Sequence, residues 1–165
     1  MIEFFIEYRA PVQKALVLLL FLLALWRGKG PERACASILL AMVFVHISFR
    51  DLLQFDEVYA SLDPVGFLID TGGLVGLLWI AMRANRFYPL VLAAAQLVSF
   101  MAHLVRLLVE PISSLAYYLL AAMPFWFQIF ILAGGIAHHI YRTSYLGNYS
   151  DWRLVPQRTP RTSYS

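Results

Sequence analysis

Ionisable side chains interrupt three apolar segments of this chain. They are two histidines, an aspartate and two arginines: His46, Arg50, Asp70, His103 and Arg106. Ionisable groups are costly to place in lipid, so we expect these five side chains to face one another. An aspartate pairs with arginine, and an imidazole beside it binds a proton or is oriented by the carboxylate. The pattern therefore predicts a polar cluster in which Asp70 pairs with Arg50 or Arg106.

Four interpretations of this cluster stay open. It is a structural network, a ligand or proton site (quinone or lipid headgroup included), a b-type haem site, or a catalytic metal site. Bis-histidine haem ligation needs two histidines at similar depth on two helices, and His46 and His103 satisfy that condition. A catalytic metal is less favoured because H-x-x-x-H and E-x-x-H spacings are absent. We expect no catalytic residue, metal or cofactor, with haem b as the alternative.

Small residues and a proline predict how the surrounding helices pack. Gly72, Gly73 and Gly76 give a G-x-x-x-G spacing, which allows close helix contact inside a bundle. Pro124 predicts a kink in the last apolar segment and leaves one main-chain carbonyl without its helical donor.

Two glutamines and a cysteine complete the polar positions within the apolar segments. Gln96 and Gln128 lie near the middle of their segments, where such side chains can form hydrogen bonds between helices and hold a bundle together. Cys35 is the single cysteine, which excludes an internal disulfide and favours a packing role. His138 and His139 are expected at a membrane boundary.

The elements that position these residues follow from composition. The 165 residues are 61% hydrophobic and 14% charged, against about 45–50% and about 25% in soluble domains. A chain of this size has no core large enough to bury that much apolar surface, so lipid is the expected solvent. The basic residues are scattered among short loops, which argues against nucleic-acid binding.

Five apolar segments predict five transmembrane helices. Crossing a bilayer takes about 20 helical residues, and the expected spans are 10–26, 34–52, 64–82, 87–109 and 115–140. The segments do not alternate apolar and polar residues, as β-barrel strands do. We therefore predict an all-α bundle over residues 1–140 and a basic, tyrosine-rich tail over 141–165. The alternative is four spans, with the first segment lying in the interface.

The basic residues divide unequally between the two sides of this arrangement. One side carries Arg27, Lys29, Arg33, Arg83, Arg86, Arg142, Arg153, Arg158 and Arg161. The other side carries Arg9, Lys14, Arg50 and Arg106. Because cytoplasmic loops are enriched in Lys and Arg, the split of nine against four predicts an external N-terminus and a cytoplasmic C-terminus.

The stretch Ala81-Met-Arg-Ala-Asn-Arg-Phe-Tyr-Pro-Leu90, with the later Ala-Gln-Leu-Val-Ser-Phe-Met-Ala-His103-Leu, resembles small polytopic bacterial inner-membrane proteins of no assigned function. The resemblance covers about a fifth of the chain. It implies a multi-pass protein of the bacterial inner membrane and no particular activity.

Three functional hypotheses follow. The first is a non-catalytic accessory or assembly subunit, whose partners are the lipid bilayer and other membrane-protein subunits. The small size of the chain, its lack of a reaction motif and its long aromatic tail favour this hypothesis. The second is a b-type haem or quinone-linked redox protein that uses His46 and His103. The third is a small proton-coupled transporter that uses Asp70.

Overall fold

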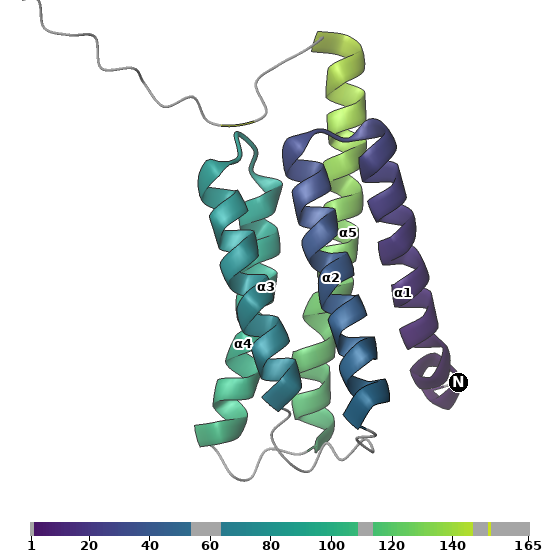
Figure 1. The fold of residues 1–165 in the computed structure, drawn as a ribbon, viewed down its shortest axis with the longest axis vertical. Coiled ribbons are helices and arrows are strands. Elements are labelled where there is room, and N and C mark those ends of the chain that lie inside the picture. Colours follow the sequence, from purple (N-terminus) through teal and green to yellow (C-terminus); the bar gives the residue numbers. More distant parts are fainter. Residues whose placement is uncertain (1, 54–63, 109–113, 147–151, 153–165) are drawn as a thin grey trace, which may run out of the picture.

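Five helices make up the computed structural model, which describes residues 2–53, 64–108, 114–146 and 152 (Figure 1). Apart from one isolated bridge between Ala84 and Trp152, every regular element in these ranges is α-helical. The helices are α1 (Ile2–Arg27), α2 (Gly30–Leu53), α3 (Pro64–Arg83), α4 (Tyr88–Leu108) and α5 (Ser114–Leu146). The prediction of an all-helical bundle with five helices is confirmed.

Successive helices run antiparallel, and each packs on the next in chain order (Figure 1). The last helix, α5, closes the ring by contacting α1 and α2 as well as α4. The α1–α2 and α3–α4 turns therefore share one end of the bundle with the C-terminus of α5. We call this end the Gly28 end, after the glycine in the α1–α2 turn.

Glycine and proline set the helix boundaries at this turn. The Gly28 N–H donates to the Ala24 carbonyl at 2.9 Å, and a Cβ at Gly28 would lie 2.6 Å from that oxygen. Only glycine therefore fits this helix end. Pro31 lies in the first turn of α2, where a missing N–H costs nothing.

All five helices are long and apolar enough to cross a membrane. Large apolar side chains such as Leu19, Val75 and Phe130 lie on the outside of the bundle, which is the surface that lipid covers in a multi-pass protein. The first helix lies alongside α2 and α5 as part of the bundle (Figure 1).

Three helix boundaries differ from the expected spans by more than one residue. The first helix extends back to Ile2, and α2 begins at Gly30 rather than at 34. The last helix continues to Leu146, so the first residues of the expected tail are helical. The rings of Tyr141 and Tyr145 contact each other one turn apart there, with centroids 4.7 Å apart and planes tilted by 44°. The rest of the tail, apart from Trp152, lies outside the described residues.

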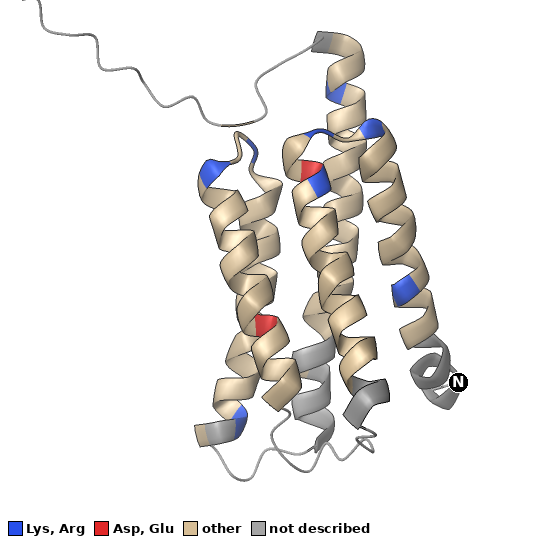
Figure 2. Cartoon of the chain, viewed as in Figure 1, with Lys and Arg blue, Asp and Glu red and all other residues tan. Residues whose placement is uncertain are grey.

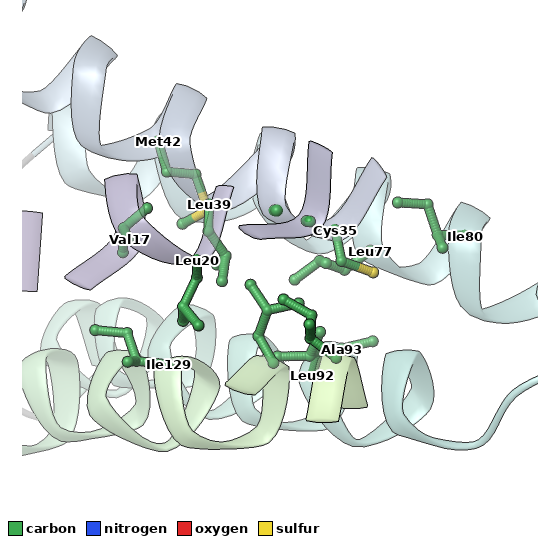
Figure 3. Close-up of a cluster of buried hydrophobic side chains, with 14 of the residues drawn as sticks. Val17, Leu20, Cys35, Leu39, Met42, Leu77, Ile80, Leu92, Ala93 and Ile129 are labelled. Carbon is green, nitrogen blue, oxygen red and sulfur yellow. The ribbon is translucent and has the colours of Figure 1, made fainter. Parts of the chain in front are cut away.

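The core lies along the bundle axis and draws side chains from every helix (Figure 3). It includes Val17 of α1, Leu39 of α2, Leu77 of α3, Leu92 of α4 and Ile129 of α5. Cys35 is fully buried in the same cluster, as expected for a packing residue.

Two of the three predicted packing glycines bring α3 against α2. A Cβ at Gly73 would lie 2.5 Å from the Met42 sulfur, and one at Gly76 would lie 2.8 Å from Ile38 Cδ1. A Cβ at Gly72 would meet no described atom within 4 Å. The close face therefore uses Gly73 with Gly76, and Gly72 lies off it. Pro124 lies inside α5, and its predicted kink stays a prediction.

Candidate functional site

A chain of hydrogen bonds connects three helices within the segments that are long and apolar enough to cross a membrane. Asp70 of α3 lies between two residues of α4: its Oδ2 is 3.1 Å from His103 Nε2, and its Oδ1 accepts a hydrogen bond from Gln96 Nε2 at 3.0 Å. Gln96 and His103 are seven residues apart, so they share one face of α4 about 10 Å apart. One carboxylate therefore bridges two turns of the neighbouring helix.

The chain continues from α4 to α5. Gln128 Nε2 donates to Gln96 Oε1 at 2.6 Å and lies 3.5 Å from the Leu92 carbonyl oxygen. Both glutamines are buried, and the structure joins them to each other, which is consistent with their expected role of holding helices together. Gln128 Oε1 accepts no hydrogen bond from the described residues. We call His103, Asp70, Gln96 and Gln128 the central network.

Aromatic rings and a glycine hold the central network in place. The Phe67 ring meets His103 edge-on, with centroids 6.0 Å apart, and stacks on Phe100 at 5.4 Å. Gly73 lies one turn beyond Asp70, and its missing side chain leaves room for Met42 and Gln96. The imidazole and the carboxylate are therefore fixed by packing as well as by their mutual bond.

The structure brings together two of the five residues predicted to form the polar cluster, Asp70 and His103. His46 and Arg106 are half-buried on α2 and α4, and the side chain of Arg50 lies outside the described residues. An ion pair between Asp70 and either arginine stays a prediction.

The geometry of the described residues gives limited support to a metal site or a haem site. Within the described ranges, no group of three or more His, Cys, Asp or Glu side chains is placed to hold a metal ion. The His103 Nε2, which a haem iron would need, is bonded to Asp70. Haem ligation by His46 and His103 stays a prediction, which an optical spectrum of the purified protein after haem supplementation tests directly.

A second polar cluster lies at the Gly28 end and centres on Glu32. Its Oε1 pairs with Arg86 Nη1 and accepts a hydrogen bond from the Tyr88 hydroxyl at 3.2 Å, while its Oε2 accepts one from the Lys29 N–H at 3.1 Å. The Glu32 side chain is 0% exposed and that of Arg86 is 7% exposed. We call Lys29, Glu32, Arg86 and Tyr88 the Glu32 cluster. It ties the start of α2 to the α3–α4 turn.

Local helix chemistry explains why Glu32 points inward. The Arg33 N–H donates to the Lys29 carbonyl, so Lys29 caps the N-terminus of α2 and Glu32 is the third helical residue. A glutamate at that position reaches back to the capping residue's N–H, which is half of a capping box. Its other oxygen then faces the neighbouring turn.

The Glu32 cluster was not predicted from the sequence, because its charged members resemble ordinary loop residues. Arg86 counts as one of several basic residues that a cytoplasmic loop carries, and Tyr88 as an aromatic anchor. The available signal is that Glu32 is the one acidic side chain among the described residues of a basic end (Figure 2). An isolated carboxylate there is expected to find a cationic partner.

The two adjacent histidines at the Gly28 end have different surroundings. His139 is buried, with its Nδ1 3.4 Å from Thr143 Oγ1, and His138 is exposed. The side chain of His138 is therefore exposed at this end of the bundle, whereas His139 packs inside it, and the membrane-boundary position of both stays a prediction.

A groove between α4 and α5 opens on the outside of the bundle. Its volume is about 600 Å³, and its lining is apolar: Ala94, Ala95 and Val98 of α4 with Met123, Pro124 and Phe127 of α5 are among the residues that form it. Alanines leave space on α4 that larger side chains would fill. We call this feature the α4–α5 groove.

Comparison with known proteins gives no relative from which a function could be transferred. No protein family, no curated protein and no solved structure matches this chain. The resemblance to small bacterial inner-membrane proteins stays a prediction, and function has to be argued from the two clusters and the groove.

Proposed function

We propose that this chain is a non-catalytic accessory or assembly subunit of a larger complex in a bacterial inner membrane. The observation that carries the proposal is the α4–α5 groove, an apolar concave surface on the outside of two membrane-spanning helices. Such a groove fits the ridge of a partner's transmembrane helix, because small residues let helix backbones approach closely.

The use of polar groups inside the spans supports the same proposal. Asp70, Gln96 and Gln128 bond to neighbouring helices of this chain, and the groove presents apolar side chains. A substrate site would need polar groups converging on a pocket. The bundle instead uses these groups to hold itself together and leaves an apolar face for docking.

The proposed orientation places the Gly28 end in the cytoplasm. Most basic segments of the described chain gather at that end (Figure 2), as the positive-inside rule requires. The C-terminus of α5 also lies there, so the tail would meet cytoplasmic parts of the complex.

Photo-crosslinking in cells tests the docking surface. A crosslinking amino acid replaces Ala94 in the groove or, as a matched control, Leu22 on the exposed face of α1. We expect one discrete protein adduct from position 94 and none from position 22. Lipid adducts alone at both positions would contradict the proposal.

A small proton-coupled transporter is the second candidate, favoured by the ionisable pair inside the spans. Asp70 keeps 17% of its side chain exposed beside the 4% exposed His103, so the carboxylate is the more accessible member of the pair. Asp70→Asn should then abolish proton-coupled flux in reconstituted vesicles. Unchanged flux and substrate binding in this variant would remove the candidate.

A further inference from the structure

The central network has a direction, set at its Asp70 end. Gln128 donates to Gln96, and Gln96 donates to Asp70 Oδ1, so each N–H points from α5 towards α3. Gln96 Nε2 also lies 3.2 Å from the main-chain oxygen of Asp70, which favours the same direction. An ionised carboxylate only accepts hydrogen bonds, so it requires this orientation of the amides.

The α5 end of the network holds this direction only weakly. The Gln128 Nε2 contact with the Leu92 oxygen is long, at 3.5 Å, and Gln128 Oε1 accepts nothing from the described residues. The nitrogen and oxygen of a side-chain amide have nearly the same shape, so both orientations fit the same space. Apart from the fixed main-chain contact of Gln96, the carboxylate is the group in this network whose protonation can change the orientation that the two amides favour.

We propose that Asp70 Oδ1 binds an exchangeable proton, and that this proton reverses the Gln96 and Gln128 amides so that α5 responds to protonation on α3. A hydronium ion gives its proton to Oδ1 and leaves as water, while His103 Nε2 keeps its bond to Oδ2. The new O–H donates to Gln96 Oε1 once that amide has turned over. Gln96 Nε2 then donates to Gln128 Oε1, and no covalent bond within the protein changes other than this protonation.

Besides the pair itself, the two helices that pack on α3 carry other ionisable residues towards the same end of the bundle. They are Arg106 on α4 and His46 on α2; the side chain of Arg50 lies outside the described residues. Over residues 123–137, α5 carries no ionisable side chain and contributes Gln128 to the network. If His103 or His46 held the proton while Asp70 stayed ionised, the direction of the amides would not change. Amide reversal therefore distinguishes protonation of Asp70 from protonation of a histidine.

Side-chain amide NMR of the full chain in lipid nanodiscs tests the proposal, with ¹⁵N label in glutamine. As the pH is lowered, the Gln96 and Gln128 signals should move together with one midpoint, and the Gln13 signal of α1 should stay fixed. Asp70→Leu should abolish the movement of Gln128, and His46→Leu should preserve it.

Two results would overturn the proposal. The first is a Gln128 signal that stays fixed while Gln96 or the His103 ring titrates. The second is a Gln128 response that persists in Asp70→Leu. If Asp70→Leu does not fold, the wild-type titration decides alone, because a common midpoint for both glutamines is required. The inference does not depend on the proposed docking function, since the crosslinking result and the amide titration are independent.

Discussion

The two polar clusters solve the same problem differently. Each joins neighbouring helices through a buried or half-buried carboxylate. The Glu32 cluster, at the Gly28 end, neutralises its carboxylate with the arginine of a turn, whereas Asp70, further along its span, takes an amide and an imidazole as partners. Close to a helix end, a charged partner can be supplied by a loop. Deeper in the bundle, a permanently charged guanidinium is costly, and an amide and an imidazole take its place.

Breaking the Glu32–Arg86 pair should have the largest effect on stability. Arg86→Met leaves the buried Glu32 charge uncompensated, which costs about 3–5 kcal/mol. Arg83→Met is the matched control, because Arg83 is exposed and stacks on Trp79 at the surface. Unfolding in mixed micelles with increasing SDS measures both. Equal stabilities of the two variants would show that the pair contributes little.

Removing both charges sharpens this result. The double variant Glu32→Met with Arg86→Met should recover most of the loss, because replacing a buried pair with apolar residues is often close to neutral. A double variant as unstable as Arg86→Met would mean that the Tyr88 and Lys29 contacts to Glu32, and not the charge balance, hold this end of the bundle.

Adding a methyl group at Gly135 tests the packing beside the Glu32 cluster. A Cβ there would lie 2.8 Å from the Tyr88 ring, so Gly135→Ala should cost about 1–3 kcal/mol through overpacking. A Cβ at the adjacent Gly134 meets no described atom within 4 Å, so Gly134→Ala should gain up to about 1 kcal/mol from helix propensity. Unfolding in SDS measures the change in stability of both variants. A change of the same sign in both would contradict the close contact between Gly135 and Tyr88.

Breaking the central network should have a smaller effect. Gln96→Leu removes the bonds to Asp70 and Gln128, and such bonds inside membrane bundles contribute about 0.6–1.7 kcal/mol each. The same unfolding measurement applies, with the outward-facing Leu97→Ala as the control. If Gln96→Leu lost as much stability as Arg86→Met, the two clusters would contribute equally to stability, and the expected difference between them would be wrong.

The smallest expected effect is that of Tyr88→Phe. This change deletes the hydroxyl that donates to Glu32 at 3.2 Å and keeps the ring against Gly135, so the loss should be about 0.5–1.5 kcal/mol. Comparing this loss of stability with that of Arg86→Met sets the hydroxyl contribution beside the charge-pair contribution. A larger loss for Tyr88→Phe would assign the main role to the hydroxyl.

The helices and the central contacts were accessible from sequence because their signals are local or periodic. Apolar runs of bilayer length predict five helices, and polar residues inside such runs have to meet one another, as Asp70 and His103 do. Helix ends are harder to predict. The start of α2 depends on a capping contact of Glu32, and that contact also turns the side chain inward.

The partners of the predicted cluster could not be ranked from sequence, because helix rotation decides them. Arg50, Arg106 and His103 lie at similar expected depth, and only the packing of α3 on α4 selects the imidazole and Gln96 for contact with Asp70. The α4–α5 groove likewise depends on how two apolar faces fit, which composition does not encode.

The mass of the assembly extracted from native membranes tests the proposed function most directly. Native mass spectrometry from nanodiscs should show this chain bound to a second, different protein, and Ala94→Trp, which fills the α4–α5 groove, should release it. Leu22→Trp, on the exposed face of α1, should keep the complex intact. A wild-type chain that is extracted alone, or a partner held equally by both variants, would contradict docking through the groove.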